Sequence, residues 1–156
     1  MPNERCRQME QLSREHDEGM AFADRISELA SDGSEESLAE GVRLVQAYYQ
    51  EELEQHLQHE EQTIFAPIVQ FHREHFSLCV RLGTEHGLLR TMATGMRLET
   101  AQRDLPAFAD ILRKHTVAEE EELLPLVESL FTPEQLDAVM HFTPLPGTPH
   151  GRGPAN

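Results

Sequence analysis

Apolar residues recur at alternating steps of three and four positions along most of this chain, the spacing of helices that bury one face. The third helix shows this spacing most regularly, at Cys79, Leu82, His86, Leu89, Ala93 and Met96, a series in which only His86 is polar. Strand signals are few, and proline and glycine are sparse before the C-terminal segment. The pattern predicts helices over residues 3–30, over 35–69, from a start between 70 and 77 to 98, and from an N-cap at Asp104 through Leu126.

Short breaks separate these helices and set the expected domain. Residues 31–34 read Ser-Asp-Gly-Ser and predict a loop, and Pro67 is expected to kink or weaken the last turn of the second helix. Thr132-Pro-Glu-Gln135 is a capping box that predicts a short fifth helix. We therefore expect an all-α fold, an up-down-up-down four-helix bundle with a short C-terminal fifth helix, over residues 1–142. Residues 143–156, rich in proline and glycine, are expected to form a poorly ordered tail.

Polar residues interrupt the apolar stripe of each long helix. Two tetrads, His56-x-x-x-Glu60 and His115-x-x-x-Glu119, each place an imidazole and a carboxylate on one helix face, one turn apart. A Glu-His pair precedes each tetrad, so the chain reads as two helical hairpins of similar design. Packed together, these hairpins would bring one histidine from each helix into the core. The polar residues on the stripes are His16, His56, Glu60, His86, His115 and Glu119.

These buried positions need a common explanation. A single buried histidine is usually a core residue with ordinary hydrogen-bond partners, but an unpaired buried carboxylate costs roughly several kcal/mol. Mutual hydrogen bonding among the histidines and glutamates is one explanation. A metal ion would satisfy all of them at once, and imidazole with carboxylate is a ligand set that suits iron, zinc or manganese. We therefore predict a metal site built from these side chains.

The other histidines are expected to lie outside this site. His59, three residues after His56, lies off the centre of the stripe and is predicted on a solvated helix face. His75 precedes His86 by eleven residues, which is about 16 Å along a helix axis. The remaining histidines, also expected away from the site, are His72, His141 and His150.

Three further glutamates adjoin the predicted ligands. Glu61 and Glu120 directly follow Glu60 and Glu119, so either could replace its neighbour, support the site from outside or face solvent. Glu122 is in phase with the core but belongs to a run of glutamates, which is typical of a solvated face. The sequence leaves open which of them, if any, completes the site.

Composition narrows the classes of function. The chain has 156 residues, 38% hydrophobic content and a net charge of −15, which fits one globular domain and argues against nucleic-acid and anionic-membrane partners. No apolar run approaches the ~20 residues of a membrane span, and the first residues lack a signal-peptide core. We therefore expect a cytoplasmic protein. The two cysteines, Cys6 and Cys79, form no metal or redox motif, and the chain has no H-E-x-x-H, phosphate-loop or ferritin-type Glu-x-x-His signature.

The ordered set of motifs resembles the hemerythrin-like (HHE cation-binding) family over residues 12–130. The resemblance implies a bundle that holds a non-haem di-iron centre with an oxo or hydroxo bridge, with zinc or manganese as alternatives. Members of the family bind O₂, respond to iron or oxygen, or act on nitric oxide and damaged iron centres. The resemblance implies that His16 and His56 ligate one iron and that His86 and His115 ligate the other. It also implies that Glu60 and Glu119 bridge the two irons.

The chain departs from the respiratory hemerythrins in its third helix. Those proteins have a second histidine one turn from the first, where the neighbouring stripe positions here are Leu82, Leu89 and Arg90. Five ligands per iron would leave one position open on each metal. The resemblance therefore implies a centre that binds O₂ or NO, or that senses or handles iron. The alternatives are a di-iron oxidoreductase that reduces NO, peroxide or O₂ with an external electron donor, and a structural bundle with zinc. The oligomeric state is left open.

Overall fold

A computed structural model describes residues 5–149, and every regular element within that range is helical. Short 3-10 turns precede three of the α-helices, at Arg7–Met9, Arg73–His75 and Leu98–Thr100. The α-helices are α1 (Glu10–Asp32), α2 (Glu35–Tyr48), α3 (Glu54–Glu60), α4 (Ala66–Phe71), α5 (Phe76–Gly95), α6 (Ala101–Ala118), α7 (Leu124–Leu130) and α8 (Pro133–Val139).

Single π-helical turns join several of these helices into longer rods. Tyr49–Leu53 connects α2 to α3, Glu61–Phe65 connects α3 to α4, and Glu119–Leu123 connects α6 to α7. A π turn adds one residue to a helical turn and shifts the side chains that follow it around the axis. The described chain therefore has four long helices and one short one, as the sequence predicts.

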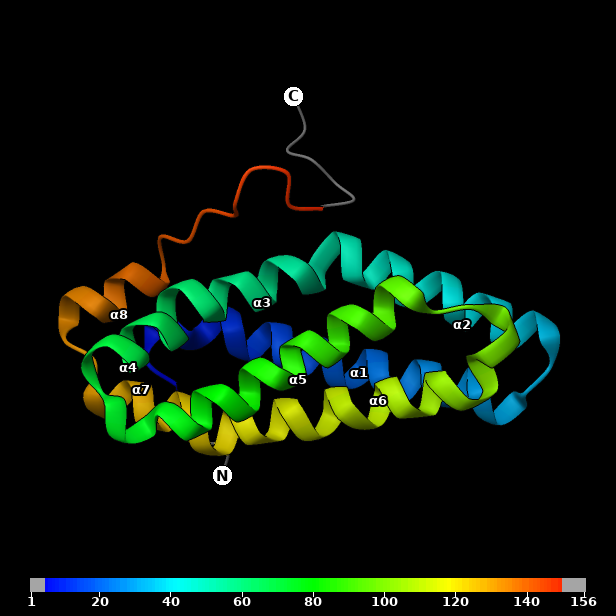
Figure 1. Cartoon of the computed structure of the whole chain (residues 1–156), viewed down its shortest axis with the longest axis horizontal. Helices are drawn as coiled ribbons and strands as arrows, with labels where there is room; N and C mark the ends of the chain where they lie inside the picture. Colours follow the sequence, from blue (N-terminus) through cyan, green and yellow to red (C-terminus); the bar gives the residue numbers. More distant parts are fainter. Residues whose placement is uncertain (1–4, 150–156) are drawn as a thin grey trace.

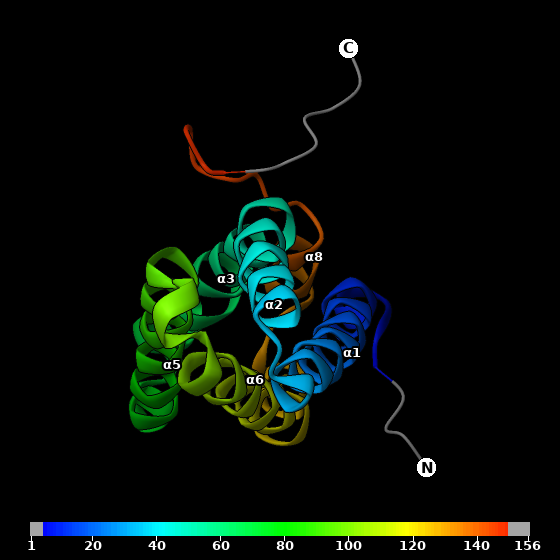
Figure 2. The same ribbon diagram turned by 90° about the vertical axis from the view of Figure 1, so that its right-hand side faces the viewer.

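The four long helices form a bundle. Each runs in the opposite direction to the one before it (Figure 1), and the end view places α1, α2, α5 and α6 around a common axis (Figure 2). Helix α1 packs against both α2 and α6, and α5 packs against α6. Within residues 5–149, no helix is both long enough and apolar enough to cross a lipid bilayer.

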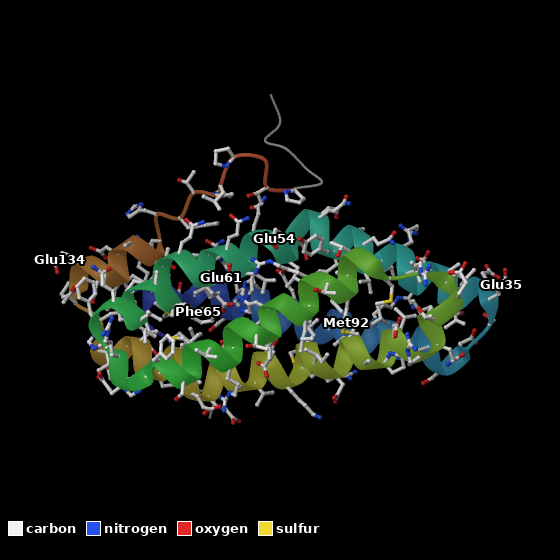
Figure 3. The ribbon with its side chains drawn as sticks, viewed as in Figure 1. Glu35, Glu54, Glu61, Phe65, Met92 and Glu134 are labelled. Carbon is white, nitrogen blue, oxygen red and sulfur yellow. The ribbon has the colours of Figure 1, made fainter. Side chains whose placement is uncertain are left out.

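The apolar core is divided into two clusters. The first lies toward the loop between α1 and α2 and includes Ile26, Val45 and Phe108. The second lies toward α8 and includes Ile64 and Leu124. Figure 3 shows Met92 and Phe65, which pack in the first and second clusters, on opposite sides of the mid-bundle region where Glu54 and Glu61 lie. The buried polar residues occupy the layer between the clusters.

Helix starts differ from the predicted ones in two places. The first helix begins at Glu10 after a 3-10 turn, whereas it was predicted from residue 3, which lies outside the described residues. The fourth begins at Ala101, so Asp104 lies inside α6, where it pairs with Arg103 at 2.8 Å and is not an N-cap. The preceding 3-10 turn and the complete burial of Ala101 set this earlier start.

Pro67 does not end the second rod, which stays helical through Phe71. It is the second residue after the π turn Glu61–Phe65, where the regular i to i−4 hydrogen-bond pattern is already interrupted, so its missing N–H is tolerated. Pro125 occupies the same place after the π turn Glu119–Leu123.

The C-terminal segment returns along the bundle. The capping box is confirmed, because Thr132 Oγ1 accepts from the backbone N–H of Gln135 at 3.2 Å and the Gln135 side chain accepts from that of Thr132 at 3.0 Å. Beyond α8 the chain lies against α3, where Gln58 accepts from the Leu145 N–H at 3.1 Å and donates to Thr148 Oγ1 at 2.9 Å. Residues 150–156 of the predicted tail, which include His150, lie outside the described residues.

Candidate metal centre

The structure brings the predicted ligands together in the middle of the bundle. They form two overlapping groups in which all the potential ligand atoms lie within 4.8 Å of one another. Glu60 and Glu119 belong to both groups and are fully buried. The groups are His16, His56, Glu60 and Glu119, and then Glu60, His86, His115 and Glu119.

The Nε2 atom of every histidine faces the two central carboxylates. Each of these nitrogens lies within hydrogen-bonding or ion-pair distance of at least one carboxylate oxygen. The shortest separations are 3.0 Å from His16 to Glu119, 3.4 Å from His56 to Glu60, 3.2 Å from His86 to Glu60, and 3.1 Å from His115 to Glu119.

The Nδ1 atom of every histidine faces outward and contacts a second carboxylate. Because a carboxylate accepts a hydrogen bond from an N–H at this nitrogen, each pair orients its ring and directs Nε2 at the centre, where it can donate a lone pair to a metal once its proton has left. The sequence left the roles of Glu61 and Glu120 open and did not assign Glu15 or Glu85 any. The pairs are His16 with Glu120 at 2.6 Å, His56 with Glu15 at 2.8 Å, His86 with Glu61 at 2.7 Å, and His115 with Glu85 at 2.8 Å.

The site has two similar halves: the first half contains His16 and His56, and the second half contains His86 and His115. The Glu before the first histidine of each hairpin contacts the second histidine of the same hairpin, and the Glu after each tetrad contacts the first histidine of the other hairpin. The imidazoles of His16 and His56 meet edge to face with centroids 4.9 Å apart, and those of His86 and His115 do so at 4.8 Å. The repeated Glu-His pair and H-x-x-x-E-E motif were the sequence signal for this arrangement.

Burial and mutual contact shift the ionisation of the site. Burial would raise the pKa of Glu60, but the surrounding imidazoles hold it well below its ordinary value. Burial and the charge of Glu60 would likewise raise the pKa of Glu119, yet contacts with His115 and His16 lower it to about 2. Burial would lower the pKa of His56, and the charges of Glu60 and Glu15 raise it to about 9 instead. The metal-free site therefore favours ionised Glu60 and Glu119 together with a protonated His56.

The metal-free contacts do not satisfy every group. Glu60 Oε1, Glu119 Oε2, His86 Nε2 and His115 Nε2 are buried without a hydrogen-bond partner of acceptable geometry. Mutual hydrogen bonding, the alternative to a metal, thus leaves four buried polar atoms unpaired, which is costly. All four are atoms that donate lone pairs to metals, and they converge on the two groups, so the residues fit a pair of metal ions.

Arg90 distinguishes the second half of the site. Its guanidinium donates two hydrogen bonds to Glu61, at 2.7 and 3.0 Å, and one to Glu54 at 2.8 Å. Figure 3 shows Glu54 and Glu61 close together in the middle of the bundle. On the other half, Glu120 accepts instead from the Ser13 hydroxyl at 3.0 Å. Arg90 therefore holds these two carboxylates together beside the half of the site that contains His86.

A cavity of about 170 Å³ adjoins the first half of the site. His16 and His56 line it, and its inner wall reaches His115. Gly19 and Tyr48 form part of the wall, and a Cβ on Gly19 would lie 3.1 Å from the Tyr48 hydroxyl. The lack of a side chain at Gly19 therefore leaves room beside the imidazoles.

The remaining candidates lie elsewhere, with one correction. His59 is buried, not solvated, because α8 and the segment after it cover that face: its Nε2 lies 2.6 Å from the Val139 carbonyl oxygen, and its ring stacks on Phe142. Glu122 is exposed and pairs with Arg81 at 2.6 Å. His72, His75 and His141 also lie away from the two ligand groups.

Comparison with known proteins gives one match. The model of the hemerythrin HHE cation binding domain matches residues 8–127, which span all four long helices and the whole candidate site. Searches of curated proteins and of solved structures gave no match. Since the match covers most of the chain, this protein belongs to the hemerythrin HHE cation-binding domain family.

Proposed function

We propose that the protein holds a di-iron centre at this site and uses it to bind a small neutral molecule such as O₂ or NO. The observation that supports two metal ions is the pair of overlapping ligand groups that share Glu60 and Glu119. A single ion would leave the imidazoles of one group without a metal to bind.

The chain's own residues suit such a centre. Glu60 and Glu119 would bridge the ions, His16 and His56 would hold one, and His86 and His115 the other. The low pKa values of the two carboxylates keep them charged at neutral pH, as ligands must be. When bound, the iron pair would supply redox-active positions for O₂ or NO.

The cavity supports a small and neutral ligand. A volume of about 170 Å³ admits a molecule of a few atoms but no large organic substrate. Glu15, Glu18 and Glu51 line it, so anions are disfavoured by charge. The cavity adjoins His16 and His56, so we expect the ligand to bind on that half.

The proposal is tested by metal analysis and visible spectroscopy of protein expressed with excess iron. We expect two irons per chain with oxo-bridged charge-transfer bands. His56→Ala should lose iron, whereas His75→Ala, which removes an imidazole away from the site, should keep both ions. One metal or none in the unaltered chain, or equal iron in the two variants, contradicts the proposal.

Reactivity then separates the functions that share this site. Reversible O₂ or NO binding with slow autoxidation is the expected result. Repeated turnover with an external reductant would identify an oxidoreductase, and transfer of iron to a metal-free acceptor would identify iron handling. A colourless protein with stoichiometric zinc would indicate a structural role.

A further inference from the structure

The outer wall of the cavity is strongly acidic. Glu15, Glu18, Glu51 and Glu52 line it, and the side chains of Glu18, Glu51 and Glu52 belong to exposed residues. Among residues 5–149, no lysine or arginine lines it. Glu15 extends this charge inward, because it contacts His56 Nδ1 at 2.8 Å.

The corresponding surface of the other half is different in kind. Since the two hairpins repeat each other, residues at equal distances from the equivalent histidines can be compared. Both Gly19 and Leu89 lie three residues after a first histidine, so the second half has a buried leucine side chain, itself part of the cavity wall, where the first half has a glycine. The other counterparts are Leu88 for Glu18, Ile111 for Glu52, Asp110 for Glu51, and Lys114 for Gln55.

The charged residues also differ between the two halves of the site. Asp110 is paired with Lys114 at 2.9 Å, so the second half has a neutralised carboxylate where the first half has Glu51. Arg90, four residues after His86, places a further cation there, whereas its counterpart is Met20. The negative charge is therefore concentrated on the half with the cavity.

An observation independent of charge connects the cavity to the ligands. The side chain of His115 is 3% exposed and its Nε2 has no hydrogen-bond partner of acceptable geometry, and this residue lines the same cavity. His16 and His56 line it as well. The cavity therefore runs from exposed carboxylates to buried, partly unsatisfied imidazoles of both halves.

We propose that this cavity is the route by which divalent metal ions, Fe²⁺ first among them, reach the site. The inference rests on the proposed di-iron function. Carboxylates at the mouth concentrate cations by electrostatic attraction, and exchange from Glu18 or Glu51 to the imidazoles is favourable because His and carboxylate together bind iron more tightly than exposed carboxylates do. In the second half, the position equivalent to Gly19 has the buried side chain of Leu89, and Arg90, paired with Glu54 and Glu61, stands where the first half has Met20.

The experiment measures the rate at which metal-free protein takes up Fe²⁺ under anaerobic conditions, together with the final iron content. The double variant Glu18→Gln with Glu51→Gln is compared with Glu35→Gln and Glu36→Gln, which makes the same charge change at the far end of the bundle (Figure 3). We expect uptake by the first variant to slow by roughly 3–10-fold at low salt, with unchanged final iron, and the difference to shrink at high salt.

A second variant narrows the cavity without changing the charge of its lining. Gly19→Leu gives the first half the side chain that the second half has at Leu89, and it should slow uptake at every salt concentration. Equal uptake rates for the mouth variant and the far-end control would overturn the proposed route even if Gly19→Leu failed to fold. A chain that takes up no iron at all would instead contradict the di-iron function, so the two failures are distinguishable.

Discussion

At the scale of single residues, each imidazole of the site contacts a carboxylate on both ring nitrogens. The inner contacts come from the H-x-x-x-E tetrads, and the outer contacts come from Glu15, Glu61, Glu85 and Glu120. An outer carboxylate fixes the ring and makes the inner nitrogen a better electron donor. Four outer carboxylates therefore orient four imidazoles so that each Nε2 faces the space beside Glu60 and Glu119.

Replacing an outer carboxylate should weaken metal binding without unfolding the chain. In Glu85→Gln the amide still reaches His115 but loses its charge, so we expect metal affinity to fall about 10–100-fold. The matched control is Glu121→Gln, an exposed glutamate outside the ligand groups. Competition with a chelator of known affinity measures both; identical affinities would mean that the outer contact has no role in binding.

The shifted pKa values predict opposite pH responses with and without metal. The pKa of His56 is raised from 6.5 to about 9, so its contribution to metal-free stability is complete below pH 6.5 and is lost as pH rises through about 9. That contribution is on the order of 3 kcal/mol. Glu119, lowered to about 2, contributes above pH 4.5 and loses its contribution as pH falls toward 2.

Metal-free protein should therefore melt highest between about pH 4.5 and 6.5 and lower at pH 9. Between about pH 6.5 and 9, where the metal-free protein loses stability, metal affinity should instead rise, by about tenfold per pH unit for each proton displaced. Melting curves and chelator titrations at pH 6, 7.5 and 9 check this. A metal-free melting temperature that climbs from pH 6 to 9 would show that the imidazoles are neutral before metal binds.

At the scale of helices, close contact between α2 and α6 depends on Gly41. A Cβ at this position would lie 2.5 Å from Cδ1 of Leu105, which is fully buried and has little room to move. Gly41→Ala should therefore destabilise the fold by about 1–3 kcal/mol through overpacking, despite the better helix propensity of alanine. Gly83→Ala is the control, since nothing lies within 4 Å of its added Cβ and it should stabilise α5 by up to about 1 kcal/mol.

Denaturant unfolding of the metal-free proteins gives the two free energies directly. Opposite signs for Gly41→Ala and Gly83→Ala are the expected result. Equal stabilisation by both would mean that Leu105 moves aside without cost, and that α2 and α6 are less closely packed than the structure indicates.

The stripes of apolar residues were sufficient to predict the helices and the six central residues. A 3.6-residue period marks the buried face, and a histidine or glutamate on that face stands out. The outer carboxylates could not be assigned in the same way, because Glu15 and Glu120 reach imidazoles on neighbouring helices, and such pairing depends on helix rotation. The burial of His59 was missed for a similar reason, since it depends on where α8 packs.

The π turns were not predicted at all. Nothing in single-residue propensity distinguishes Glu61–Phe65 or Glu119–Leu123 from ordinary helix. Each begins at or directly after a central glutamate, and each is followed by a proline within three residues of its end. The H-x-x-x-E-E motif with its downstream proline is the sequence signal that this structure connects to such a turn.

At the scale of the whole molecule, the polar layer separates two apolar clusters and joins all four long helices. The first cluster contains α1, α2, α5 and α6 residues, and the second is closed by α7 and α8. Each cluster contains at least ten buried apolar residues, so we expect each to hold its own end of the bundle together. We therefore expect metal binding to affect the stability of the layer between them more than that of the clusters.

Removing the metal should loosen the middle of the bundle without unfolding its ends. In the metal-free state the six central residues still attract one another, but Glu60, Glu119, His86 and His115 each retain an unpaired buried atom. We expect far-ultraviolet circular dichroism to be nearly unchanged by chelation, and the melting temperature to fall, because metal binding contributes folding free energy. Hydrogen exchange should accelerate first in the π turns Glu61–Phe65 and Glu119–Leu123, which adjoin the carboxylates, and last in the two apolar clusters. If chelation instead abolished helical signal throughout, the clusters would be unable to fold alone, and the metal would be a requirement for the fold itself. A uniform rise in exchange along α1 to α7 would give the same conclusion, whereas a rise confined to the two π turns would identify the polar layer as the site where metal binding and stability are coupled.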